Sequence, residues 1–197
     1  MTARLTLICH AATAATRATA FAADEPIEAP AAARAGALAA RIGHVDRAWS
    51  SPALCARQTA AALSLDAIAD AALRDCNFGR WAGRKLAEVH AGDPQAVAAW
   101  LADPQAVPHG GESRAAISVR IAGWLQACVK DTGRIVAVTH ASVIRAAILD
   151  VLDAPAAAFW RIDVAPLSMV ELSSDGARWS LRAGTAVIAG YRPDGES

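Results

Sequence analysis

Two short apolar segments, each followed by a histidine, constrain the fold most strongly. Residues 4–8 read Arg-Leu-Thr-Leu-Ile and lead through Cys9 to His10, and residues 135–139 read Ile-Val-Ala-Val-Thr and lead to His140. Segments that are apolar almost throughout are typical of strands covered on both faces of a sheet. Because helical patterns separate these strands, we expect a three-layer α/β/α fold around a mostly parallel central sheet.

The helical patterns have recognisable boundaries. Ser51 is a capping residue type that precedes Pro52, so a helix should begin there and run to about Leu63. Apolar residues at helical spacing predict a second helix over 112–130, and a third helix should follow His140.

Turn residues mark the connections in the second half of the chain. Residues 168–172 and 178–182 flank Asp175-Gly176, a pair favoured in hairpin turns. Residues 93–111 contain three prolines, and we expect them to form a loop-rich segment over one face of the sheet.

The length and composition favour one domain. In 197 residues we find no internal repeat and no interdomain linker, so we predict a single domain over residues 1–190, with the polar residues 191–197 as a flexible tail. No segment reaches the roughly 18 uninterrupted apolar residues of a membrane span. The formal net charge is zero, with 19 basic and 19 acidic residues, which argues against nucleic acid or an anionic membrane as the main partner.

The four cysteines indicate where the protein works. They show neither a CxxC pair nor any other zinc-binding spacing, so free thiols in a reducing compartment are expected. We therefore expect a cytoplasmic location. The sequence leaves the oligomeric state open.

Both histidines stand at a position that favours ligand binding. His10 and His140 each follow the carboxyl end of a predicted buried strand. In open parallel sheets ligands bind at that edge, and the helix N-termini there favour anions. We therefore expect the two imidazoles to lie within about 5 Å of each other on one face of the molecule.

Five segments, taken in order, carry the candidate chemistry. They read Leu-Ile-Cys-His-Ala-Ala-Thr at 7–13, Ser-Pro-Ala-Leu-Cys-Ala-Arg-Gln-Thr-Ala at 51–60, Leu-Arg-Asp-Cys-Asn-Phe-Gly-Arg-Trp-Ala-Gly at 73–83, His-Gly-Gly-Glu-Ser at 109–113 and Val-Thr-His-Ala-Ser-Val-Ile-Arg at 138–145. These segments resemble, in type and in order, the motifs of the histidine phosphatase (phosphoglycerate mutase-like) superfamily. The resemblance covers about the first 150 residues.

The resemblance implies a mechanism. His10 would attack a phosphoryl group and form a phosphohistidine, with its other ring nitrogen oriented by a backbone carbonyl. His140 would hydrogen-bond the phosphoryl oxygens. Asp75, which stands where the family has a glutamate, would protonate the leaving oxygen and later activate water. The same motifs place Thr13 and Ala141 at the phosphate.

Two positions depart from the family pattern. Cys9 and Cys55 stand where the family has arginines that grip the phosphate, and a thiol supplies neither the charge nor the fork of donors of a guanidinium. Their loss should weaken binding and turnover unless other cations take their place. The candidate substitutes are Arg17, Arg80, Arg84 and Arg145, with His109 at low pH.

The leading hypothesis is therefore a histidine-dependent phosphatase that hydrolyses a small phosphorylated metabolite, with a weakened phosphate pocket. The ligand would be such a metabolite or inorganic phosphate, and no cofactor is expected. At 197 residues there is little room for the insertions of the mutase branch. The alternative is a non-catalytic member of the family that binds a ligand or a protein partner through the same cleft.

A metal site is a further alternative. Cys9, His10, Cys55 and His140 are residue types that suit zinc. Thiols, however, reach less than about 3 Å from their Cα atoms, whereas arginines converge on a phosphate from far apart. We therefore expect the thiols not to converge with both imidazoles, and we expect no metal.

Overall fold

The two predicted strands lie side by side in the middle of the sheet. The computed structural model describes residues 3–183, and in it β1 (Ala3–Cys9) pairs in parallel with β4 (Gly133–Thr139). Cys9 is aligned with Thr139. Because the strands end at the same level, the residues that follow them, His10 and His140, emerge at the same edge.

Within residues 3–183, six strands form the sheet, in the order β3-β2-β4-β1-β5-β6. The strands β2 (Arg47–Ser50) and β3 (Ala67–Ala69) extend the parallel part of the sheet beyond β4. On the other side β5 (Met169–Ser174) and β6 (Trp179–Leu181) are antiparallel. The expectation of a mostly parallel sheet is confirmed, and so is the hairpin around Asp175-Gly176.

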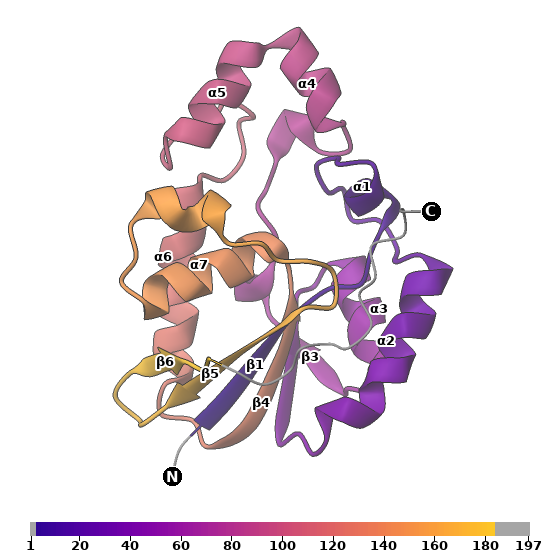
Figure 1. Ribbon diagram of the computed structural model, residues 1–197, viewed down its shortest axis with the longest axis vertical. Coiled ribbons are helices and arrows are strands. Elements are labelled where there is room, and N and C mark those ends of the chain that lie inside the picture. The colour runs from indigo at the N-terminus through magenta and orange to yellow at the C-terminus, as the bar shows by residue number, and fades with distance from the viewer. Residues whose placement is uncertain (1–2, 184–197) are drawn as a thin grey trace.

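Helices cover both faces of the sheet (Figure 1). The helices α2 (Ala29–Ile42) and α3 (Leu54–Ala62) lie on one face, and α6 (Arg114–Cys128) and α7 (Ala141–Val151) lie on the other. The smaller elements are α1 (Ala14–Arg17), α4 (Leu86–Gly92), α5 (Pro94–Ala102) and three 3-10 turns, η1 (Ala71–Leu73), η2 (Gly79–Trp81) and η3 (Ala156–Arg161). Of these, α1, α4 and α5 lie beyond the carboxyl edge of the sheet (Figure 1).

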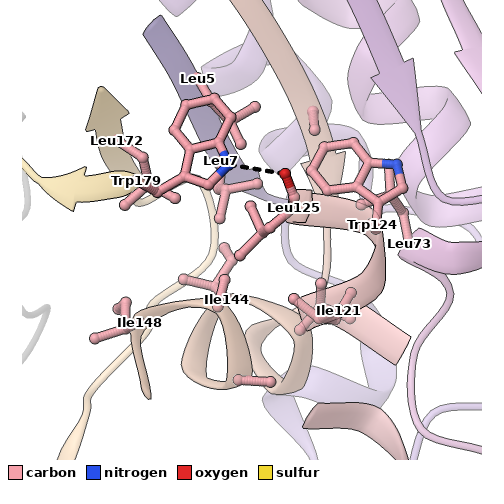
Figure 2. Close-up of a cluster of buried hydrophobic side chains, with 14 of the residues drawn as sticks. Leu5, Leu7, Leu73, Ile121, Trp124, Leu125, Ile144, Ile148, Leu172 and Trp179 are labelled. Atoms are coloured by element: carbon pink, nitrogen blue, oxygen red, sulfur yellow. Dashed lines mark hydrogen bonds between the residues drawn. The ribbon is translucent and has the colours of Figure 1, made fainter. Parts of the chain in front are cut away.

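The alternation of side chains along β1 divides the core into two layers. Leu5 and Leu7 pack against α6 and α7, whereas Ile8 packs on the side of α2 and α3. In the first layer the indole of Trp179 donates to the carbonyl of Leu125 over 2.8 Å (Figure 2). A third cluster, made by Phe21, Trp81, Val89, Val97 and Trp100, anchors α4 and α5 above the sheet.

Two local expectations are wrong. The helix expected to begin at Pro52 begins at Leu54, and its N-cap, Ala53, makes no side-chain cap because alanine has no polar side chain. The hydroxyl of Ser51 accepts from the N–H of Ala53 and contacts His140. The segment 93–111 is not simply a loop, since α5 occupies its first half. Asp93 caps this helix by accepting from the N–H of Ala96 over 2.9 Å, and a proline follows at the first helical position.

No helix within residues 3–183 is both long and apolar enough to cross a membrane. The expected tail at 191–197 lies outside the described residues, and the extent of the single domain to residue 190 stays a prediction.

Candidate active site

His10 is held with one ring nitrogen occupied and the other free. Its Nδ1 lies 2.8 Å from the carbonyl oxygen of Ala11. Since a carbonyl can only accept, Nδ1 carries a proton, and in the neutral ring the lone pair is therefore on Nε2. The ring centroids of His10 and His140 are 5.0 Å apart at an angle of 62°, in agreement with the separation expected from the sequence.

His140 is buried at the N-terminus of α7, with 2% of its side chain exposed. Its Nε2 lies 2.8 Å from the hydroxyl of Ser51. Burial lowers the pKa of His140 to about 4; the carboxylate of Asp75 opposes this shift and His10 adds to it. The imidazole is therefore neutral at pH 7, and its approach of 3.6 Å to Asp75 is not an ion pair there.

Asp75 reaches the second histidine despite its short side chain. One oxygen, Oδ2, lies 3.6 Å from Nδ1 of His140. The other, Oδ1, accepts from the hydroxyl of Ser142 and from the backbone N–H of Cys76. Ser142 was not predicted as a site residue, although it stands two residues after His140, in the first turn of α7.

A charged network fixes the segment that leads to Asp75. The guanidinium of Arg120 makes two hydrogen bonds to Glu112, of 3.0 and 2.8 Å. Its Nη1 also donates to the carbonyls of Ala72 and Arg74. Because Arg74 directly precedes Asp75, Arg120 couples the position of this carboxylate to α6.

Thr13 faces a second acidic residue that the sequence analysis missed. Its hydroxyl donates to Oε1 of Glu25 over 3.0 Å and accepts from the backbone N–H of Thr16, as the cap of α1. Glu25 lines the same cavity as His10 and Asp75. Two carboxylates therefore face the site at which an anion was expected.

The thiols of Cys9 and Cys55 are buried and protonated. Burial raises the pKa of each to about 12, and in each case Asp75 adds to the effect. The negative charges of two further carboxylates, those of Glu25 and Asp24, also raise the pKa of Cys55. Neither thiol supplies a positive charge or becomes a thiolate near neutral pH.

Cys55 lies closer to the histidines than the sequence suggested. Its sulfur and a ring nitrogen of both His10 and His140 are all within 4.8 Å of one another. A threonine explains the close approach. The hydroxyl of Thr59 donates to the carbonyl of Cys55 over 2.7 Å and accepts from the N–H of Ala11 over 2.9 Å, which ties α3 to the residue after His10. The geometric reason for expecting no convergence is therefore wrong for Cys55, while Cys9 is not part of this group.

A cavity of about 320 Å³ opens beside His10. His10, Asp75, Ala141 and Ser142 line its inner end. Five aromatic residues form part of its wall: Phe21, Phe78, Trp100, Phe159 and Trp160. Two arginines, Arg114 and Arg145, also line it.

Both arginines are held against the aromatic wall. The guanidinium of Arg145 donates to the carbonyl of Ile162 over 2.8 Å and lies 5.7 Å from the ring centre of Phe159. That of Arg114 lies 5.1 Å from the ring centre of Trp160, and its buried Nε has no hydrogen-bond partner among residues 3–183. Arg145 was among the predicted substitute cations, whereas Arg114 was not.

The other expected cations lie elsewhere. Arg80 and Arg84 are exposed and do not line the cavity. Arg17 forms an ion pair with Glu28 on the surface. His109 is buried outside the cavity lining, where its Nδ1 accepts from the N–H of Gly111 over 3.0 Å.

Known proteins share this sequence pattern and fold. Residues 5–185 match the sequence profile of the Histidine phosphatase superfamily (branch 1). A "Bifunctional protein" of Mycobacterium tuberculosis is 31% identical over 150 residues, which are 74% of this chain but only 40% of that protein. Phosphoserine phosphatase 1 of Hydrogenobacter thermophilus is 30% identical over 124 residues, 59% of each chain.

A solved structure agrees over nearly the whole length. The mycobacterial glucosyl-3-phosphoglycerate phosphatase, in complex with VO3, superposes with a TM-score of 0.81 at 27% identity. The match covers 91% of this chain and 96% of that one.

Proposed function

Since the chain belongs to branch 1 of the histidine phosphatase superfamily, we propose that it hydrolyses a small phosphorylated metabolite through a phosphohistidine at His10. The observation that carries the proposal is the state of this imidazole. Its Nδ1 is committed to the carbonyl of Ala11, 2.8 Å away, which leaves Nε2 as the nucleophile at the inner end of the cavity.

The surrounding residues supply the remaining steps. Nε2 of His10 forms the bond to phosphorus while the bond from phosphorus to the leaving oxygen breaks. Asp75 in its protonated form gives that oxygen a proton, and the resulting carboxylate regains one from the water that attacks phosphorus while the bond from phosphorus to Nε2 breaks. His140, neutral and fixed by Ser51, hydrogen-bonds the phosphoryl oxygens.

The cavity indicates the kind of substrate. Its aromatic wall suits an organic part with an apolar or planar surface. Arg114 and Arg145 offer two positive charges in the same cavity, so a substrate that carries a second anionic group beside the phosphate would gain charge-assisted hydrogen bonds there. The mycobacterial phosphatase of the same fold was solved in complex with VO3, which supports a phosphorylated ligand for this chain.

One observation favours the second candidate, a non-catalytic protein that binds a ligand or a partner in this cleft. The two positions expected to grip phosphate carry protonated thiols, and Asp75 and Glu25 face the cavity with negative charge. Such a pocket repels a phosphate dianion more than a family pocket with two arginines does.

Hydrolysis of p-nitrophenyl phosphate decides between the candidates. His10→Ala should abolish turnover, because a methyl group cannot attack phosphorus, whereas His44→Ala, at an exposed histidine outside the cavity, should leave turnover unchanged. Circular dichroism should show both variants folded. No turnover by the parent protein, or equal turnover by a folded His10→Ala variant, would favour the non-catalytic protein.

A further inference from the structure

We propose that His10, Cys55 and His140 form a binding site for Zn²⁺ or a similar borderline-soft divalent cation. One ligand atom from each residue lies within 4.8 Å of the other two. They come from three distant parts of the sequence, the loop after β1, the first turn of α3 and the N-terminus of α7. The inference goes beyond the proposed hydrolysis and does not rest on it.

Each of the two histidines has one ring nitrogen that makes no hydrogen bond within residues 3–183. His10 uses Nδ1 to donate to the carbonyl of Ala11, which is the arrangement that orients metal-bound histidines and leaves Nε2 for the ion. Nδ1 of His140 is buried and has no hydrogen-bond partner within residues 3–183. A bound cation would satisfy this nitrogen, which is otherwise costly to bury.

The distances are compatible with zinc after a small adjustment. Bonds of about 2.0–2.1 Å to nitrogen and 2.3 Å to sulfur place tetrahedral ligand atoms roughly 3.3–3.7 Å apart. From a separation of at most 4.8 Å, each side chain has to move by about 1 Å or less, which a rotation about its χ angles provides. Three protein ligands leave one position open for water, as in catalytic zinc sites.

The charges around the cluster favour a cation. Asp75 and Glu25 line the same cavity as His10, and Asp75 approaches His140 to 3.6 Å. The positive groups of the cavity, Arg114 and Arg145, are held over the rings of Phe159 and Trp160 instead. On binding, the S–H bond of Cys55 breaks, the zinc–sulfur bond forms and the proton goes to solvent.

Metal binding and phosphoryl transfer exclude each other. Both need the lone pair on Nε2 of His10, so a zinc-loaded protein has no nucleophile. Zinc should therefore inhibit any hydrolysis that the metal-free protein shows, and a chelator should restore it.

The test uses Zn²⁺ and Co²⁺ alone, without substrate. We expect calorimetric titration of chelator-treated protein to show one equivalent of Zn²⁺, and Co²⁺ to produce a thiolate-to-metal charge-transfer band. Cys55→Ala and His10→Ala should each weaken zinc binding by more than the roughly 10–100-fold that the loss of an outer-shell partner costs. Cys55→Ala should also remove the charge-transfer band.

Cys128→Ala is the matched control, since this cysteine is also buried but belongs to the end of α6 and not to the cluster. It should bind zinc like the parent. Circular dichroism shows which variants fold, and His10→Ala, at a partly exposed residue, keeps the test decisive if Cys55→Ala does not fold.

Two results would overturn the inference: the absence of stoichiometric binding, or binding that persists in Cys55→Ala and therefore belongs to a surface pair such as His44 and Asp46. Its failure is distinguishable from that of the proposed function. Zinc bound by a protein without phosphatase activity supports the site alone, and phosphatase activity in a protein that binds no zinc supports the proposed function alone.

Discussion

The salt bridge between Arg120 and Glu112 offers a stability prediction whose size follows from the structure. The two side chains are only 12% and 10% exposed and share two hydrogen bonds. Nη1 of Arg120 also donates to the carbonyls of Ala72 and Arg74, so the guanidinium joins α6 to the segment before Asp75.

The perturbation is Arg120→Met, which keeps the apolar stem and removes the donors. Breaking one side of a largely buried pair costs about 3–5 kcal/mol, because the remaining charge is left uncompensated. Arg74 still pairs with Glu112 at 3.0 Å from a more exposed position, so we expect the lower end, about 3 kcal/mol. For a chain of this size that corresponds to a fall in Tm of roughly 6–12 °C.

Urea unfolding of the parent, Arg120→Met, Glu112→Gln and the double variant measures this as a cycle. We expect the double variant to lose less than the sum of the single losses, since each single change already breaks the pair. A loss below about 1 kcal/mol for Arg120→Met, the value typical of surface pairs, would refute the reasoning. Strictly additive losses would refute the coupling.

Three further predictions concern other parts of the site and its supports. Burial lowers the pKa of His109 from 6.5, so the unfolded chain binds this proton more readily and the protein should lose stability as the pH falls below about 6.5. Urea unfolding should show a smaller loss for His109→Gln than for the parent. If the free energy of unfolding of both proteins falls equally with pH, the expectation is wrong. A Cβ at Gly111 would overlap a backbone carbonyl of a neighbouring segment, so Gly111→Ala should cost at least about 2 kcal/mol. Gly123→Ala, in α6 with open space around it, should instead add up to about 1 kcal/mol; equal melting temperatures of the two variants would contradict both expectations. Replacing both Cys9 and Cys55 with Arg should raise kcat/KM for p-nitrophenyl phosphate more than tenfold and tighten inhibition by vanadate, because each charge-assisted hydrogen bond contributes roughly 1.5–3 kcal/mol. A double variant that melts like the parent but shows neither change would argue against a phosphatase that is weakened by the two thiols at its phosphate-binding positions.

The central strands and the two histidines could be predicted because their signals are local. An apolar run such as β4 needs cover on both faces wherever it lies, and parallel strands bring their carboxyl ends to one edge. The helix α2 was not predicted, although a proline marks its start. It is alanine-rich, and the residues that it buries, Ala31 and Ala35, are small, so large apolar side chains do not mark its buried face.

The contents of the cavity could not be predicted in the same way. Arg114 and Glu25 reach it from α6 and from the loop after α1, and nothing in their sequence neighbours distinguishes them from surface charges. Arg80 and Arg84 lie within a motif of the family, yet η2 and the residues after it leave them exposed outside the cavity.

The sequence by itself determined the α/β/α layers and the edge of the sheet at which His10 and His140 come together. Strand formation and the placement of a residue at a strand's end depend on near neighbours in the chain. Only the tertiary structure decided which groups surround the two histidines. The hydrogen bonds of Thr59 connect Cys55 to the residue after His10, and Cys55 lies close to His10 and His140. The packing of α6 and η3 places the cavity's arginines against aromatic rings. Such contacts join side chains that are many residues apart, and a shift of about 1 Å in how one helix packs would form or break them, which no local pattern encodes.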